Sequence, residues 1–292
     1  MRIAVIINPV AGRGRRHPQG AERAALAAEL VGRMGVEPAI ALTRAPGHAA
    51  DLARGFVAAG YDVIAAWGGD GTINEVAGPL LRSQAALAIV PSGSGDGLAR
   101  GLGLPADAPG AFAAAASGRS ASMDVGFIGE RHFLNIAGVG FDAAVAVAFH
   151  RSGRYGVLSY AVHAVTGVWT YRCESYRVAL DGERMDGRRF VVVFANSGQY
   201  GNGLVISPDA DPSDGWLNAI VVADGPPLAQ LWRARRLFVR PLSPATGVLR
   251  TRVQTASVEG ESLVCHVDGE PFEATGRVAV RVERGALRIA GL

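Results

Sequence analysis

Residues 61–80 read YDVIAAWGGDGTINEVAGPL and join a predicted strand directly to a predicted helix. The apolar run 61–67 is typical of a short buried strand, and Thr72 is expected to open an amphipathic helix. The glycine-rich residues 68–71 leave bare backbone N–H groups at the positive end of that helix, which favours an anion there. The negative carboxylate of Asp70 is not expected in a loop that only binds phosphate. It indicates a magnesium ion beside a phosphate or a proton acceptor for a hydroxyl nucleophile, with a helix-capping aspartate as the alternative.

Similar strand–loop–helix units surround this stretch. The apolar strand 2–7 runs into the loop Asn8–Arg16, and strand 86–90 runs into a third glycine-containing loop, Pro91–Gly97. A further predicted strand stops just before Thr43. Right-handed crossovers would place the four strands in one open parallel sheet with the loops together at its carboxyl edge, where a ligand is expected.

The pattern of predicted elements changes after about Ser117. Many short apolar strands follow, separated by turns that contain glycine and aspartate, which is typical of an antiparallel sandwich. Residues 277–282 and 287–289 are predicted to be two of these strands, with a turn at Arg284-Gly285 between them. Two helices are expected within this part, over residues 141–149 and 156–171.

The fold class is therefore α/β plus β. A doubly wound α/β domain is predicted over residues 1–118 and an antiparallel β-sandwich over residues 119–283, and the segment 284–292 is left open as a completion of the first domain.

The basic residues are 29 arginines and no lysine. P-loop NTPases and protein kinases place a lysine on the phosphates, and Schiff-base enzymes need one for covalent chemistry, so these mechanisms are excluded in their usual form. The net charge of +3 does not indicate a nucleic-acid partner. The N-terminal sequence lacks the long apolar core of a signal peptide, and no apolar run reaches the length of a spanning helix.

Two acidic turns are candidate sites in the second domain. Residues 209–215 carry three aspartates, which suggests a cation loop or an acidic turn capped by Gly215. Asp268-Gly269-Glu270 joins two strands and is either a plain β-turn or a pair of carboxylates able to accept a proton and bind a metal. Residues 228–241 mix apolar side chains with arginines and favour an interfacial helix or a partly exposed one.

Together these stretches resemble the diacylglycerol kinase catalytic domain family, which includes bacterial lipid kinases and sphingosine and ceramide kinases. The motifs occur in the family order over nearly the whole chain. They are Asn8-Pro9 with Gly12; Thr43; Gly68-Gly69-Asp70-Gly71-Thr72-Ile73-Asn74-Glu75-Val76; Pro91 with Gly93-Ser94-Gly95-Asp96; Asp124-Val125-Gly126; Gly140-Phe141-Asp142; Pro208 with Asp214-Gly215; and Asp268-Gly269-Glu270.

The resemblance implies an ATP- and Mg²⁺-dependent lipid kinase with an NAD kinase-like nucleotide domain, a lipid domain and an active site in the cleft between them. It assigns the nucleotide site to Asn8, Thr43, Gly68, Gly69, Asp70, Gly71, Thr72, Asn74 and Ser94. It also makes Asp70 a metal-binding or catalytic carboxylate. Glu270, with Asp268 beside it, becomes the candidate proton acceptor, and whether Glu270 or Asp70 takes the proton stays open.

The resemblance also implies a structural Mg²⁺ site at Asp214, completed by backbone carbonyls at Asp211 and Trp216. Ser213 stands where a second aspartate is common in the family, which weakens this site. The third loop is closer to the sphingosine kinase branch than to diacylglycerol kinases, which leaves the acceptor lipid open. We add the hypothesis that at least one of Arg13, Arg15 and Arg16 reaches the nucleotide phosphates.

The predicted partner is a lipid substrate with peripheral membrane contact, and no nucleic acid; a homodimer stays open. The predicted location is the cytoplasm, with the inner face of the membrane as an open addition. Two alternatives remain: a kinase of a soluble metabolite such as NAD, and a nucleotide- or lipid-binding protein that has lost catalysis.

Overall fold

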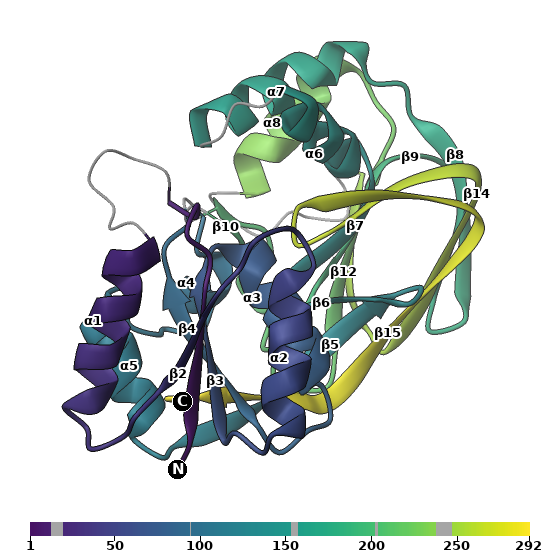
Figure 1. Cartoon of the computed structure of the whole chain (residues 1–292). Helices are drawn as coiled ribbons and strands as arrows, with labels where there is room; N and C mark the ends of the chain where they lie inside the picture. The colour runs from purple at the N-terminus through teal and green to yellow at the C-terminus, as the bar shows by residue number, and fades with distance from the viewer. Residues whose placement is uncertain (13–19, 94, 153–156, 202–203, 238–246) are drawn as a thin grey trace. The chain divides into compact units, whose positions relative to one another are not determined.

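The computed structural model describes residues 1–292 except 13–19, 94, 153–156, 202–203 and 238–246 (Figure 1). The chain forms two compact units. The first unit comprises Met1–Met123 together with Gly285–Leu292, and the second comprises Asp124–Arg284.

The first unit is built on a parallel sheet. Its strands β1 (Ile3–Ile7), β2 (Ala39–Leu42), β3 (Val63–Gly68) and β4 (Ala86–Pro91) lie in the order β4-β3-β1-β2, and each neighbouring pair is parallel. Every residue of β1, β3 and β4 is buried, as expected for apolar runs covered on both faces. The predicted open parallel sheet is therefore confirmed.

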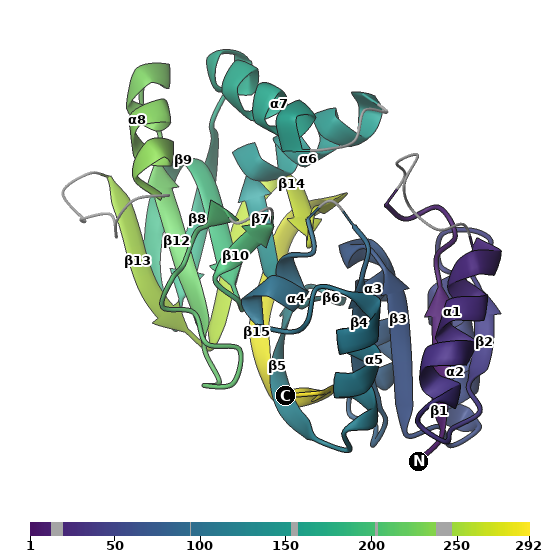
Figure 2. The ribbon, with the colours of Figure 1, turned by 90° about the vertical axis from the view of Figure 1, so that its left-hand side faces the viewer.

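Helices cover both faces of this sheet (Figure 2). Alternate strand residues such as Val5 and Trp67 share one core with side chains of α1 and α5. The helices α2 and α3 contact each other and the sheet strands. The helices of the unit are α1 (Gly20–Gly32), α2 (His48–Ala58), α3 (Asp70–Leu80), α4 (Gly97–Gly101) and α5 (Ala108–Ala116). Because α3 begins at Asp70 and not at the predicted Thr72, the aspartate lies in the first helical turn.

The second unit is an antiparallel β structure. The ladders β13-β12-β9-β7-β14-β15 run antiparallel, and β8 pairs with both β9 and β14. Its strands are β6 (Arg131–Phe133), β7 (Ile136–Gly140), β8 (Glu174–Leu180), β9 (Glu183–Ala195), β10 (Gln199–Gly201), β11 (Leu204–Val205), β12 (Leu217–Ala223), β13 (Val248–Val253) and β14 (Thr255–Val267), and β5 (Ser120–Ile128) and β15 (Glu270–Ala290) belong to both units.

The long strands β9 and β14 organise this unit, because β7 and β8 each bridge them at different points along their length. Side chains from β7, β8, β9 and β14, including Phe194 and Leu263, form one apolar core. Strands β5 and β6 form a hairpin across Gly129-Glu130. Three helices complete the unit: α6 (Phe141–Ser152), α7 (Val157–Thr170) and α8 (Pro227–Leu237).

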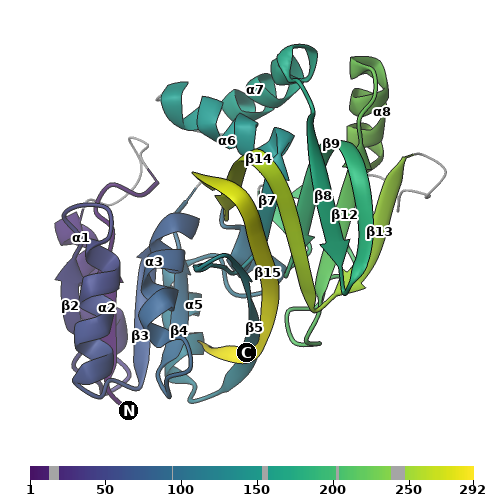
Figure 3. The ribbon, with the colours of Figure 1, turned by 90° about the vertical axis from the view of Figure 1, so that its right-hand side faces the viewer.

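Two strands differ from what the sequence analysis predicts. The predicted turn at Arg284-Gly285 is wrong, since β15 runs through it as one curved strand (Figure 3). Gly285 has a φ of 58° within the strand, so the glycine serves a local irregularity and not a chain reversal. Strand β13 was not predicted, because Arg250 and Arg252 give it a polar pattern.

Among the described residues, no helix is both long and apolar enough to cross a membrane.

Candidate active site

The carboxyl edge of the first unit's sheet brings the predicted loops together. The backbone N–H of Asn8 donates to Trp67 O at 2.9 Å, and that of Thr43 donates to Ile7 O at 2.9 Å. The N–H of Ser92 donates to Gly68 O at 3.1 Å. These bonds extend the parallel ladder into the loops and fix where each loop leaves the sheet.

Asn8 and Thr72 are joined side chain to side chain. Asn8 Nδ2 donates to Thr72 Oγ1 at 2.9 Å, and Asn8 Oδ1 accepts from the N–H of Val10 at 3.0 Å. Gly68 makes room for this contact, since a Cβ there would lie 2.5 Å from the Cβ of Thr72. Thr72 is buried, so its hydroxyl ties the first loop to the start of α3.

Asp70 lies in the first turn of α3, where the helix dipole stabilises a negative charge. Its Oδ2 accepts a long hydrogen bond of 3.4 Å from the N–H of Gly97, at the start of α4. A Cβ on Gly95 would approach the same oxygen to 3.0 Å. The carboxylate therefore faces the third glycine loop.

The second and third loops touch through their glycines. A Cβ on Gly93 would lie 2.9 Å from the Cα of Gly69 and 3.0 Å from Oδ1 of Asp96. The N–H of Gly93 donates to that Asp96 oxygen at 2.8 Å. Gly69 and Gly93 thus allow the two loops to pack closely. Ser94 lies outside the described residues.

Asn74 and Glu75 follow on α3. Asn74 is half-buried. Glu75 Oε1 accepts from the N–H of Gly47 at 2.9 Å, and its Oε2 accepts from the N–H of Ala49 at 3.2 Å. Glu75 therefore holds the N-terminus of α2 and, with it, the segment that follows Thr43.

Arg23 on α1 is a site residue that sequence reasoning missed. Its Nη1 donates to Asn8 O and its Nη2 to Ala11 O, both at 2.9 Å, and the guanidinium lies over the Trp67 ring at 5.7 Å from the centroid. It is 1% exposed, and burial lowers the pKa of this guanidinium. The available signal was its position four and seven residues before the apolar Ala27 and Leu30, on the buried face of α1.

The arginines predicted to reach the nucleotide were different ones. Arg13, Arg15 and Arg16 lie outside the described residues, so that hypothesis stays a prediction.

In the second unit, the β14–β15 turn carries the predicted carboxylates. Asp268 and Gly269 have φ angles of 48° and 89°, and Val267 pairs with Glu270 across this two-residue turn. The carboxylate of Asp268 accepts three backbone N–H groups, from Leu134 at 2.8 Å, Asn135 at 2.8 Å and Ile136 at 3.0 Å. These three hydrogen bonds fix the turn on the segment before β7.

Glu270 differs from Asp268 in its surroundings. Its side chain is 59% exposed, and its Oε2 lies 3.3 Å from Nε2 of His150 on α6. The other ring nitrogen of His150 lies 3.0 Å from Ala146 O, so Nδ1 carries a proton. Of the two acids, Glu270 is the one open to a substrate.

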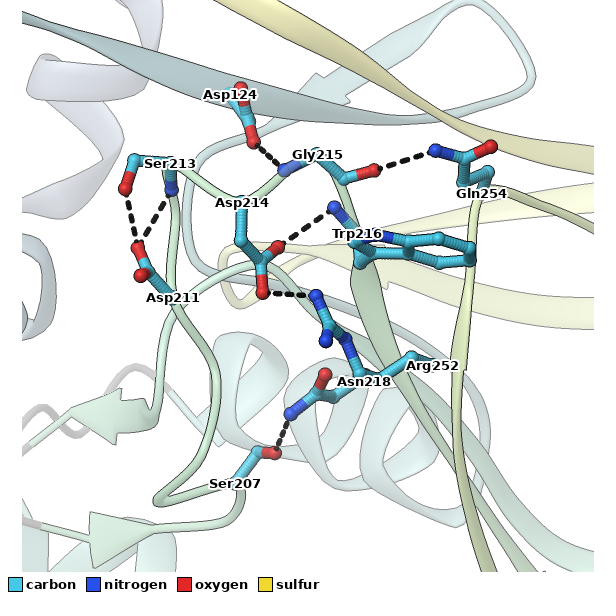
Figure 4. Close-up of polar contacts among 10 residues, drawn as sticks. All are labelled: Asp124, Ser207, Asp211, Ser213, Asp214, Gly215, Trp216, Asn218, Arg252 and Gln254. Atoms are coloured by element: carbon cyan, nitrogen blue, oxygen red, sulfur yellow. Dashed lines mark hydrogen bonds and ion pairs between the residues drawn. The ribbon is translucent and has the colours of Figure 1, made fainter.

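In the predicted metal turn, the carboxylates of Asp214 and Asp211 accept nitrogen and hydroxyl donors (Figure 4). Asp214 Oδ2 pairs with an Nη of Arg252 at 2.5 Å, and its Oδ1 accepts from the N–H of Trp216 at 2.9 Å. Asp211 Oδ1 accepts from the N–H and the hydroxyl of Ser213, at 2.9 and 2.6 Å. No group of three or more metal-ligating side chains occurs in the described part of the chain. In this arrangement, the carboxylate of Asp214 does not fit Mg²⁺.

Comparison with known sequences identifies the family. A profile of the diacylglycerol kinase catalytic domain matches residues 2–128, and a profile of the YegS C-terminal NAD kinase beta sandwich-like domain matches residues 135–291. The chain belongs to the diacylglycerol kinase catalytic domain family. It is therefore a kinase, and the resemblance drawn from the motifs is confirmed.

Members of this family share the chain at moderate identity. A protein of Chromohalobacter salexigens named "Probable lipid kinase YegS-like" is 32% identical over 278 residues, which cover 90% of this chain and 87% of the relative. A "Diacylglycerol kinase" of Mycobacterium tuberculosis is 31% identical over 223 residues, which cover 73% of this chain and 72% of the relative.

A solved structure supports the fold. The crystal structure of a diacylglycerol kinase from Bacillus anthracis superposes with a TM-score of 0.75 at 18% identity, covering 99% of this chain and 96% of that one. The α/β unit followed by a β-sandwich-like unit is therefore the fold of the family.

Proposed function

We propose that this chain transfers the γ-phosphoryl group of ATP, with Mg²⁺, to the hydroxyl of a lipid. The observation that carries this proposal is the carboxylate of Asp70 in the first turn of α3, facing a second glycine loop at the carboxyl edge of a parallel sheet. Family membership supports a kinase. The names of the relatives, lipid kinase and diacylglycerol kinase, support a lipid acceptor.

The first unit would bind the nucleotide. Backbone N–H groups of residues 68–72 lie at a helix N-terminus, which suits phosphate oxygens without any lysine. Asn8, Thr43 and Asn74 lie at or near the same edge, and Ser94 belongs to the third loop. Bound with ATP, Mg²⁺ would neutralise phosphate charge, and the carboxylate of Asp70 would hold it.

The second unit would supply the proton acceptor. Glu270 is exposed, whereas both oxygens of Asp268 accept backbone N–H groups. In the proposed step, the hydroxyl proton of the lipid moves to a carboxylate oxygen of Glu270. The hydroxyl oxygen bonds to the γ-phosphorus as the bond to the β–γ bridging oxygen breaks, and ADP leaves. Asp268 acts as a positioning residue for Glu270.

A lipid acceptor requires contact with a membrane surface, and α7 and α8 offer one. Val162, Val165 and Trp169 are 52%, 51% and 56% exposed and share a face of α7 at helical spacing. On α8, which contacts α7, Leu228 and Trp232 are 74% and 48% exposed. We propose that these five side chains form a membrane-facing patch, because exposed tryptophans and aliphatic side chains favour the bilayer interface.

ADP release from Mg-ATP tests the function directly. We expect stimulation by one member of a panel of detergent-dispersed lipids containing diacylglycerol, sphingosine, ceramide and phosphatidylglycerol. Asp70→Asn should abolish the stimulation, and Asp51→Asn, an exposed aspartate on α2, serves as the charge-matched control. If NAD alone stimulated ADP release, the chain would instead be a kinase of a soluble metabolite. If the chain bound ATP without releasing ADP, it would be a binding protein.

Sedimentation with phosphatidylglycerol vesicles tests the patch. We expect Trp169→Glu and Trp232→Glu to lose vesicle binding while retaining activity on a detergent-dispersed lipid. Met34→Glu, at an exposed apolar position on the first unit, is the control. Unchanged vesicle binding by both tryptophan variants would contradict the patch.

A further inference from the structure

The acidic turn 209–215 carries three aspartates, and arginines from two strands lie against it. Arg252 on β13 pairs with Asp214, and its guanidinium carbon lies 5.3 Å from the centroid of the Trp216 ring. Arg250, two residues earlier on the same strand, donates to Ile206 O at 2.6 Å. The charge of Asp214 is therefore neutralised by an arginine of the same chain.

A third arginine lies close to the turn. Arg284 on β15 lies against Gly215 so closely that a Cβ on this glycine would collide with the guanidinium. Gly215 also has a φ of 79°, which favours glycine at this position.

The geometry at Asp214 leaves little for a divalent cation. Mg²⁺ requires oxygen ligands in octahedral geometry at about 2.0–2.1 Å. One carboxylate oxygen of Asp214 faces a guanidinium, and the other accepts the N–H of Trp216 (Figure 4). A guanidinium at hydrogen-bonding distance would repel a second positive charge at the same carboxylate.

We propose that Arg252 takes the place of the structural cation in this turn. The guanidinium neutralises Asp214, packs on Trp216 and holds residues 211–216 in their conformation, and the turn binds no Mg²⁺. This inference concerns the stability of the second unit and does not depend on the proposed reaction.

A series of hydrogen bonds connects the acidic turn 209–215 with the β14–β15 turn, which carries Glu270. The N–H of Gly215 donates to Asp124 Oδ2 at 2.6 Å, and the N–H of Asp124 donates to Pro212 O at 2.7 Å. Asn196 Nδ2 donates to the carbonyls of Asp124 and Leu134, both at 2.9 Å.

This series of hydrogen bonds reaches the β14–β15 turn, because the N–H of Leu134 donates to the carboxylate of Asp268. The hydrogen bonds therefore run from the turn at Asp214 to the β14–β15 turn.

Thermal unfolding without nucleotide tests the proposal. For the wild-type chain, we expect the same midpoint in millimolar MgCl₂ and in EDTA. Arg252→Ala should lower the midpoint by about 2–4 °C, the shift expected when roughly one modest ion pair is lost from a domain of this size. The control is Arg177→Ala, which removes an exposed arginine paired with Glu259. Its thermal unfolding midpoint should be the same with and without Mg²⁺.

Terbium luminescence gives a second readout. Trp216 lies beside Asp214, so a Tb³⁺ ion at this carboxylate would be sensitised by its indole. We expect no Asp214-dependent emission from the wild-type chain and emission from Arg252→Gln, in which the carboxylate is released. Arg252→Gln also keeps the test valid if Arg252→Ala fails to fold.

Two results would overturn the proposal. One is a wild-type midpoint that rises with Mg²⁺ and loses this rise in Asp214→Asn, because it would place a cation at the turn. The other is an Arg252→Ala chain with the wild-type midpoint and no Asp214-dependent emission from Arg252→Gln.

Discussion

The imidazole of His266 donates from Nε2 to Asp142 Oδ2 over 2.9 Å, and both side chains are buried. The N–H of Gly269 donates to the other ring nitrogen, Nδ1, at 3.3 Å. Because a backbone N–H only donates, Nδ1 carries the lone pair and Nε2 the proton. A Cβ on Gly138 would collide with both side chains. The imidazole thus joins the first turn of α6 to the turn that carries Glu270.

Replacing His266 with alanine should destabilise the chain strongly. The substitution removes a partner from the buried carboxylate of Asp142, and we expect a loss of about 2–4 kcal/mol in the free energy of unfolding, measured with urea. His163→Ala, at a half-buried histidine on α7, should change it by less than about 0.5 kcal/mol. Equal effects of the two substitutions would argue against a structural role for the His266–Asp142 pair.

The two acids of the β14–β15 turn should respond differently to amide substitution. Glu270→Gln should lower kcat by at least about 100-fold, as for loss of a general base, with the thermal midpoint unchanged. Asp268→Asn should lower both kcat and stability, the latter by about 1.5–3 kcal/mol, because it weakens three charge-assisted hydrogen bonds. Glu273→Gln, exposed on the same strand, is the control. A Glu270→Gln enzyme with the wild-type kcat would exclude Glu270 as the base.

The thiols should be unreactive in the folded chain. Burial raises the pKa of Cys265 to about 12, and burial together with a hydrogen bond to Asp224 raises the pKa of Cys173 to about 12. At pH 8 the thiolate is scarce, so a disulfide reagent should modify Cys265 slowly in the native protein and both thiols quickly in guanidinium chloride.

The same shifts give a pH dependence of stability. The folded pKa values lie above the usual value of about 8.5, so the folded state holds these protons more tightly. The resulting stability is fully present below pH 8.5 and is lost as the pH rises toward 12. A thermal midpoint that rises between pH 9 and 11 would contradict this sign.

The contact between the glycine loops can be tested by adding one methyl group. Gly93→Ala would push against Gly69 and Asp96, and we expect a loss of about 1–3 kcal/mol in stability together with weaker ATP binding. Gly55→Ala places the same methyl group in α2, where nothing lies within 4 Å, and should stabilise the chain by about 0.5–1 kcal/mol. Wild-type ATP affinity in Gly93→Ala would show that the loops tolerate separation.

The local pattern of apolar residues and glycines was sufficient to predict the strands of the first unit, but it predicted the strands of the second unit only in part. Continuous apolar runs ending in glycine loops predict parallel buried strands, and β1, β3 and β4 follow this prediction. Arg284-Gly285, where the chain passes from the second unit to the first, has the composition of a turn, yet it lies within β15, because pairing with distant strands outweighs local propensity.

Local sequence also predicted only part of the candidate active site. Asp70 could be found from its own loop, but the role of Asp268 depends on N–H groups more than 130 residues away. The ion pair of Asp214 with Arg252 and the buried contacts of Arg23 are also set by tertiary packing. No short motif in the sequence encodes these partners.

The fate of the γ-phosphate tests the central claim most directly. The wild-type chain would be incubated with γ-labelled ATP, Mg²⁺ and the lipid panel, and the label would be followed into the organic extract. The account predicts a labelled lipid that is absent with Asp70→Asn and strongly reduced with Glu270→Gln. Label found only in inorganic phosphate, or only in a phosphorylated soluble metabolite, would contradict it.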